Sequence, residues 1–125
     1  MKQDQSFPKE EKLKSRKVIG QIFSNGFVVK SYPIRIQFIF HDQKEFPWCQ
    51  VGVSVPKRNF KKAVDRNRIK RQLREVYRLH KQLLTEKLKA SDKRIAMMII
   101  FAGKEKVEYA DIKTHLIAAL ERIRI

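Results

Sequence analysis

Hydrophobic and polar residues alternate with a period of two in the first half of the chain. From Ile34 to Phe40, apolar side chains recur at every second position, which is typical of a strand with one buried face. The segment Trp48–Val55 alternates in the same way and places Cys49 on its apolar side. A short polar turn, residues 41–44, follows the first of these strands. This arrangement predicts that the two strands pair as an antiparallel hairpin.

Three other segments have the apolar spacing that is typical of helices. The first begins after Ser15, whose hydroxyl suits a helix cap, and ends at Asn25-Gly26. A long second helix is predicted from about Ala63 to about Lys89, with Ser91-Asp92 after its end. The last helix has one apolar stripe between Tyr109 and Ile123.

Residues 94–101 (RIAMMIIF) are apolar at nearly every position, which is typical of a central strand covered on both faces. A further short strand is expected at Phe27–Lys30. The resulting order predicts an α+β fold, in which a small, mostly antiparallel sheet packs with helices in a sandwich. The 125 residues fit one domain, 1–125, and we expect its polar residues 1–13 to form a flexible lead-in.

The chain is strongly basic, with 29 Lys and Arg against 13 Asp and Glu and a net charge of +16. Such an excess favours polyanionic partners, either nucleic acid or an anionic membrane surface. The longest apolar run, residues 95–102, is too short to cross a bilayer, and the N-terminal residues lack the apolar core of a secretory signal. One cysteine, Cys49, cannot form an internal disulfide, so we expect a cytoplasmic location.

Residues 57–81 hold eleven basic side chains and only two acidic ones. On a helix, the apolar residues of this region fall on one side: Ile69, Leu73, Val76, His80, Leu83 and Leu84. The opposite side carries a polar, cationic set: Asn67, Lys70, Arg71, Arg74, Arg78 and Lys81. Solvated helices usually mix both signs of charge, whereas a ridge of one sign fits the phosphates of a folded RNA. A membrane surface is less favoured because the apolar side is committed to the core.

The sequence offers no catalytic constellation. The three histidines share no spacing, and we expect His80 at the edge of the core. The acidic residues Asp65 and Glu75 lie within the basic helix and are expected to make local ion pairs. There is no zinc-ligand spacing and no glycine-rich phosphate loop. Trp48 is either an anchor at the sheet edge or a stacking platform. The pattern therefore argues for a non-catalytic RNA-binding chain.

Two motifs carry a resemblance to a known family. Val51–Val55 (VGVSV) is followed by Lys57-Arg58, and residues 62–71 (KAVDRNRIKR) are followed by Arg74-Glu75. With these motifs, over roughly residues 12–122, the chain resembles the bacterial ribonuclease P protein subunit. The family often has a Lys-Lys-x-Gly-x-Ala-Val stretch before the helix. This chain departs from it at Asn59-Phe60-Lys61, which lacks the glycine and has one extra residue.

The resemblance implies a protein partner for a catalytic RNA that removes the 5′ leader from precursor tRNA. In that family the RNA carries the chemistry with Mg²⁺, and the protein binds the catalytic RNA and the single-stranded leader. The chain would then be the auxiliary subunit of an endoribonuclease, with no catalytic residue and no metal assigned to it. The resemblance also implies an unusual left-handed βαβ crossover. The alternatives are a non-catalytic structural rRNA-binding protein and a stand-alone nuclease.

The candidate sites combine the resemblance with the residue patterns. The candidate RNA-binding residues are Lys57, Arg58, Lys62, Arg66, Asn67, Arg68, Lys70, Arg71, Arg74 and Arg78. The family holds the leader between its first helix and the open sheet face, and the positions here that match are Ile19, Phe23, Gln37 and Ser54. The family prefers aromatic residues at several of these, and Ile19 and Gln37 depart from that preference. The strand alternation adds Arg35 and Gln50, which would face outward with Gln37 and Ser54 as a polar floor for an extended RNA strand. Core packing alone is the alternative role for Ile19 and Phe23.

Overall fold

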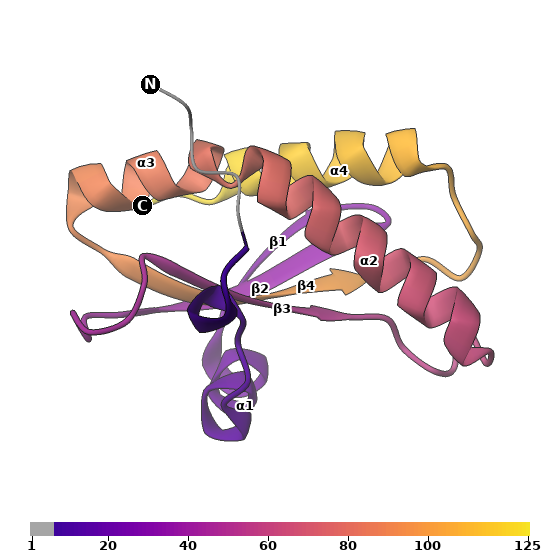
Figure 1. Ribbon diagram of the computed structural model, residues 1–125, viewed down its shortest axis with the longest axis horizontal. Helices are drawn as coiled ribbons and strands as arrows, with labels where there is room; N and C mark the ends of the chain where they lie inside the picture. Colours follow the sequence, from indigo (N-terminus) through magenta and orange to yellow (C-terminus); the bar gives the residue numbers. More distant parts are fainter. Residues whose placement is uncertain (1–6) are drawn as a thin grey trace.

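The computed structural model describes residues 7–125 and contains one four-stranded sheet with helices on both faces. In chain order the elements are η1 (Lys9–Glu11), α1 (Arg16–Asn25), β1 (Phe27–Ser31), β2 (Ile34–His41), β3 (Cys49–Ser54), α2 (Ala63–His80), α3 (Gln82–Ser91), β4 (Arg94–Phe101) and α4 (Tyr109–Arg122). Helices α2, α3 and α4 cover one face of the sheet, and α1 lies on the other (Figure 1). The predicted α+β sandwich is confirmed, as is the short strand after α1.

The predicted hairpin between β2 and β3 is wrong, because β4 lies between them in the order β1-β2-β4-β3. At the centre of the sheet, Met97 of β4 pairs with Phe38 of antiparallel β2 and with Val51 of parallel β3. Alternation had indicated the buried face of each strand, but it carries no information about which strands are neighbours. The apolar β4 occupies the centre, where both of its faces are covered, as predicted. The parallel pair β3 and β4 is joined through α2 and α3; the hand of this crossover stays a prediction.

Each face of the sheet has its own core. The larger core lies under α2, α3 and α4 and includes Leu73 and Tyr77, both fully buried. The smaller core lies under α1, where Ile22 packs with the alternate β4 residues Met98 and Ile100. Because both faces of β4 are buried, the strand fixes α1 on one side of the sheet and the basic helix α2 on the other.

Helix α1 begins and ends where the sequence predicted. The Ser15 hydroxyl accepts a hydrogen bond from the Val18 backbone N–H at 3.2 Å, which caps the helix. At the other end, a Cβ at Gly26 would lie 2.3 Å from the Ile22 carbonyl oxygen and 3.0 Å from the Phe38 carbonyl oxygen. Only glycine permits this close approach of the helix end to β2, so Gly26 leads the chain directly into the edge strand β1.

The predicted long helix over residues 63–89 is two helices that meet at Lys81 (Figure 1). No proline or glycine marks this junction, and Lys81 itself keeps a helical backbone. Its side chain is buried, with its ammonium 3.0 Å from the Glu11 carboxylate. The prediction that Lys81 belongs to the exposed cationic set is therefore wrong. Leu83, predicted on the buried stripe, is 39% exposed, while Leu84 is fully buried.

Residues 7–13 differ from the flexible lead-in expected over 1–13; residues 1–6 lie outside the described residues. The Leu13 backbone N–H donates to the Val51 carbonyl at 2.9 Å, and the Leu13 side chain is buried. The Phe7 ring lies 5.5 Å from the Tyr77 ring. This segment therefore covers the outer edge of β3 and reaches α2.

Candidate nucleic-acid interface

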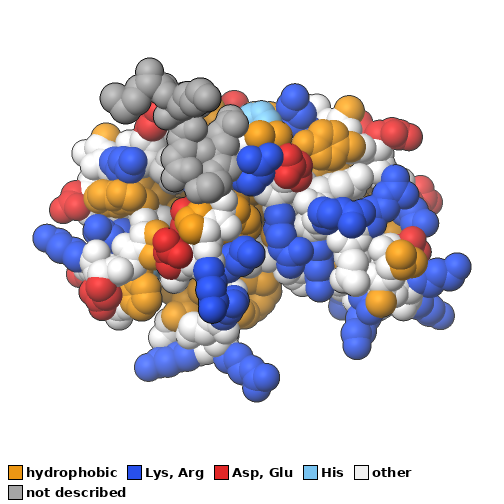
Figure 2. All heavy atoms as spheres, in the orientation of Figure 1, with side chains coloured by type: hydrophobic (Ala, Val, Ile, Leu, Met, Phe, Trp, Pro, Cys, Tyr) orange, Lys and Arg blue, Asp and Glu red, His pale blue; other side chains and the backbone are white. Residues whose placement is uncertain are grey.

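The outward face of α2 carries a row of polar and cationic side chains, here called the basic ridge. Its members are Asn67, Lys70, Arg71, Arg74 and Arg78. Ile69 and Leu73 hold the opposite face of the helix in the core. Figure 2 shows Lys and Arg side chains gathered over the part of the molecule where α2 lies. The helix therefore cannot rotate to bury its charge, and it presents one sign of charge to solvent.

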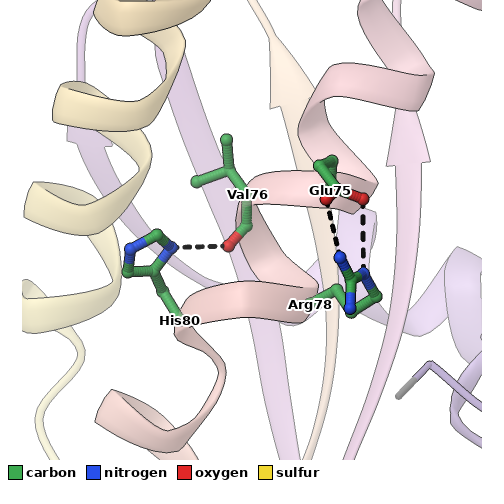
Figure 3. A network of polar contacts seen from close by, with 4 residues as sticks. All are labelled: Glu75, Val76, Arg78 and His80. Atoms are coloured by element: carbon green, nitrogen blue, oxygen red, sulfur yellow. Dashed lines mark hydrogen bonds and ion pairs between the residues drawn. The ribbon is translucent and has the colours of Figure 1, made fainter. Parts of the chain in front are cut away.

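Members of the basic ridge differ in whether an acidic side chain pairs with them. Arg78 pairs with Glu75 at 2.7 Å, and Figure 3 shows the two hydrogen bonds between them. This pair lowers the pKa of Glu75, mainly through the hydrogen bond from Arg78. Arg71 and Arg74 are exposed and have no acidic partner among residues 7–125. These two arginines are thus the strongest candidates for contacts with phosphate.

Arg66, a candidate RNA-binding residue, points its guanidinium toward the preceding loop. One nitrogen donates to the carbonyl oxygens of Phe60 and Lys61, both at 2.8 Å. The loop that departs from the family pattern is held in this way, and its Phe60 ring is buried 5.8 Å from the Phe101 ring. The exposed cations of the loop, Lys57, Arg58 and Lys62, follow it to the start of α2.

Arg68 is exposed on a different flank of α2 from the basic ridge. It lines a pocket of about 430 Å³ together with Asp65 and Tyr109. Asp65 pairs with Lys106 at 2.9 Å, and this hydrogen bond lowers the pKa of the Asp65 carboxyl. The local pair predicted for Glu75 is present, whereas Asp65 reaches the loop before α4. Arg68 therefore lies apart from Arg71 and Arg74, in a pocket that three acidic residues also line: Asp65, Glu108 and Asp111.

The candidate leader cleft lies on the α1 face of the sheet. Strand register places Ser54, Ile100 and Arg35 in one row across β3, β4 and β2. Ile19 and Phe23 lie one turn apart on α1; Ile19 packs against the smaller core, and Phe23 is 47% exposed. The Phe23 ring is thus accessible to a ligand, whereas the Ile19 side chain mainly packs against the core.

The polar floor inferred from a hairpin is not continuous. β4 separates Arg35 and Gln37 from Gln50 and Ser54, and its α1-facing residues are buried. Gln50 lines a groove of about 1020 Å³ on the flank of α1 that carries Val18. Its side-chain amide donates to the Glu10 carbonyl at 3.2 Å. Gln50 is therefore on the other side of α1 from Phe23.

Sequence reasoning missed Lys30. In the antiparallel ladder of β1 and β2, Lys30 lies directly opposite Arg35. Both residues line a pocket of about 520 Å³ with Val28 and Gln37. The sequence shows a lysine in the short strand before the turn. Only the register between the two strands shows that Lys30 lies opposite Arg35.

The remaining candidate groups have structural partners. The His80 ring nitrogen lies 2.9 Å from the Val76 carbonyl oxygen, at the core edge as predicted (Figure 3). Trp48 packs against the larger core, and the Arg94 guanidinium lies 4.2 Å from its ring centre, which favours the anchor role. Burial raises the pKa of the Cys49 thiol to about 12. In residues 7–125, no three His, Cys, Asp or Glu side chains are grouped to hold a metal ion, and no helix is long and apolar enough to cross a membrane.

Comparison with known proteins agrees with this architecture. The family model described as ribonuclease P matches residues 7–124. The ribonuclease P protein component of Porphyromonas gingivalis W83 is 30% identical over 115 residues, covering 92% of this chain and 84% of that protein. That of Dictyoglomus thermophilum is 37% identical over 120 residues, covering 94% and 91%.

Solved structures show the same fold. The RNase P protein from Thermotoga maritima superposes with a TM-score of 0.72 at 23% identity, covering 90% of this chain and 97% of that one. The protein from Staphylococcus aureus gives a TM-score of 0.69 at 22% identity, covering 88% and 92%. The fold and the sequence matches together define a protein subunit of a ribonucleoprotein endoribonuclease. The chain belongs to the ribonuclease P protein family, which acts in tRNA processing, and this membership implies association with ribonuclease P RNA.

Proposed function

We propose that the chain docks on the catalytic RNA through the basic ridge and the loop before α2, and that it holds the 5′ leader of precursor tRNA beside α1. The observation that carries the proposal is the pair Arg71 and Arg74, exposed on a helix whose other face is locked in the core. A guanidinium grips phosphate oxygens at two points, and each neutralised phosphate releases counterions. The RNA would supply the catalytic centre, and the chain would supply binding and position.

Magnesium belongs with the RNA in this proposal. Mg²⁺ prefers carboxylate oxygens in near-octahedral geometry. The acidic side chains of α2, Asp65 and Glu75, are each engaged by a cation, Lys106 and Arg78 respectively. The residues of the basic ridge therefore fit a phosphate and do not fit a divalent cation.

The leader would lie along the flank of α1 that carries Ile19 and Phe23. Phe23 offers an exposed ring for stacking with a base, and Arg35 and Ser54 offer polar groups in the row below. A reducing cytoplasm suits the single, buried Cys49. On the evidence of the strand order, Gln50 contributes to a different surface.

The first test is precursor-tRNA cleavage by the cognate catalytic RNA at low Mg²⁺, with and without the chain. We expect the chain to stimulate cleavage and to cleave nothing by itself. Absence of stimulation would contradict the proposal and favour a structural rRNA-binding protein. Cleavage by the chain alone would identify a stand-alone nuclease.

The second test separates leader binding from packing. Phe23→Ala should weaken the affinity of the reconstituted enzyme for precursor tRNA more than for mature tRNA, because only the precursor has a leader to stack. Phe46→Ala is the matched control, since Phe46 is 38% exposed and lines the groove on the other flank of α1. Equal losses for precursor and mature tRNA would mean that Phe23 serves packing alone.

A further inference from the structure

Two cations face each other at the edge of the sheet. Lys30 of β1 and Arg35 of β2 are direct partners in the antiparallel register. Arg35 is also the register partner of Ile100, which lies in the smaller core with α1, so the pair is on the α1 face. Like charges directly opposite each other destabilise a sheet. An anion bound between the two side chains would relieve this repulsion.

No anion is provided by the residues that line this pocket. They are Val28, Lys30, Arg35 and Gln37, and none is acidic. The Nε atom of Arg35 is buried and has no hydrogen-bond partner within the described part of the chain. A buried donor without an acceptor is costly, so a ligand that supplies an acceptor would be bound favourably.

The edge strand is held in place from the opposite face of the sheet. Arg122 of α4 donates a hydrogen bond to the Lys30 carbonyl oxygen. On the neighbouring residue, the Ser31 hydroxyl lies 2.9 Å from a ring nitrogen of His115, also on α4. The backbone that carries Lys30 is therefore fixed relative to β2. The two side chains therefore extend from a fixed backbone spacing, which lowers part of the ordering cost of binding.

We propose that Lys30 and Arg35 clasp one backbone phosphate of the precursor-tRNA leader, an inference that rests on the proposed function. The row Ser54, Ile100, Arg35 and Lys30 crosses three interstrand spacings, about 14 Å, on the face of the sheet that α1 covers. Ile100 in the middle of this row is buried, so a leader stacked on the exposed Phe23 ring would run beside the row and reach the two cations at its end. The ammonium supplies a point charge and the guanidinium a planar fork, so the clasp reads phosphate and not base identity.

The experiment uses the enzyme reconstituted from the full chain and its cognate RNA. Precursor tRNAs carry a single neutral methylphosphonate in place of one leader phosphate, moved one position at a time. The variant is Lys30→Gln with Arg35→Gln, and the matched control is Lys87→Gln with Lys113→Gln, which removes two exposed cations elsewhere. Thermal unfolding of the variant chain checks its fold, and we expect no loss of stability because a repulsion is removed.

At one leader position, the methylphosphonate should weaken binding to the wild-type enzyme by about tenfold. The double variant should bind the native leader about tenfold more weakly and show no further loss with the methylphosphonate. The slope of log affinity against log salt should also fall by about 0.7, as for one single-strand phosphate. The control variant should behave as wild type in each measurement.

Two results overturn the clasp while leader binding stands: full methylphosphonate sensitivity in the double variant, or an equal loss of affinity for mature tRNA. A different result, a wild-type enzyme with no preference for leader-bearing tRNA, overturns the proposed function itself.

Discussion

Replacing Arg71 and Arg74 together by alanine tests whether the basic ridge contacts phosphates. Both side chains are exposed and lack an acidic partner among residues 7–125, so their full charge is available to RNA. If each neutralises one phosphate of a helical RNA, the slope of log affinity against log salt falls by about 1.8 in the double variant. The affinity advantage of the wild type should then shrink about tenfold when salt rises from about 50 to about 200 mM.

The assay is filter binding of the catalytic RNA by the purified chain across a salt series. The matched control replaces Lys87 on α3 and Lys113 on α4 by alanine, which removes the same charge from exposed helix positions away from the basic ridge. The control should keep a slope near that of the wild type. If both double variants lowered the slope equally, the effect would reflect net charge, and the assignment of the ridge would be refuted.

Three further predictions concern the scaffold that holds the basic ridge. Leu73→Ala should lower the free energy of unfolding by about 2–5 kcal/mol, because Leu73 is fully buried. Leu83→Ala, at a site that is 39% exposed, should lower it far less, and urea unfolding of both variants measures the difference. Arg66→Ala should cost about 1–3 kcal/mol in the same assay, through the two loop carbonyls that lose their donor, and a loss no larger than that of Lys87→Ala would contradict this role. Because burial raises the pKa of Cys49 to about 12 from an ordinary value of 9.0, folding should lose stability as pH rises from about 9 toward 12. Cys49→Ala should weaken that dependence, and the buried Tyr77, whose pKa is also raised by burial, should keep the part above about pH 10. A thiol reagent at pH about 8 should label Cys49 only in urea that unfolds the chain.

The sequence allowed the elements and their buried faces to be predicted because alternation and capping are local signals. Ser15 and Gly26 mark the ends of α1, and the uninterrupted apolar run of β4 marked a strand covered on both sides. Strand neighbours are set by non-local packing, and β2 and β3 were wrongly paired for that reason. The helix break at Lys81 also escaped prediction, because its distinguishing contact is an ion pair with a residue 70 positions away.

For the candidate site, too, the sequence predicted which residues are exposed but not which residues contact one another. Helical periodicity placed Arg71 and Arg74 on the exposed face, where the structure has them. Periodicity cannot show that Arg66 turns back to bond the loop before the helix. Nor can it show that Lys30 meets Arg35, since this contact depends on the register between β1 and β2.

The position of β4 has a consequence for synthesis on the ribosome. This strand pairs with both β2 and β3 and contributes residues to both cores. It consists of residues 94–101, which follow the basic helix in the sequence. A nascent chain that ends before residue 94 has its arginine-rich helix but no sheet centre against which to fold it. Stable packing of this helix against the sheet must therefore await synthesis of the last quarter of the chain.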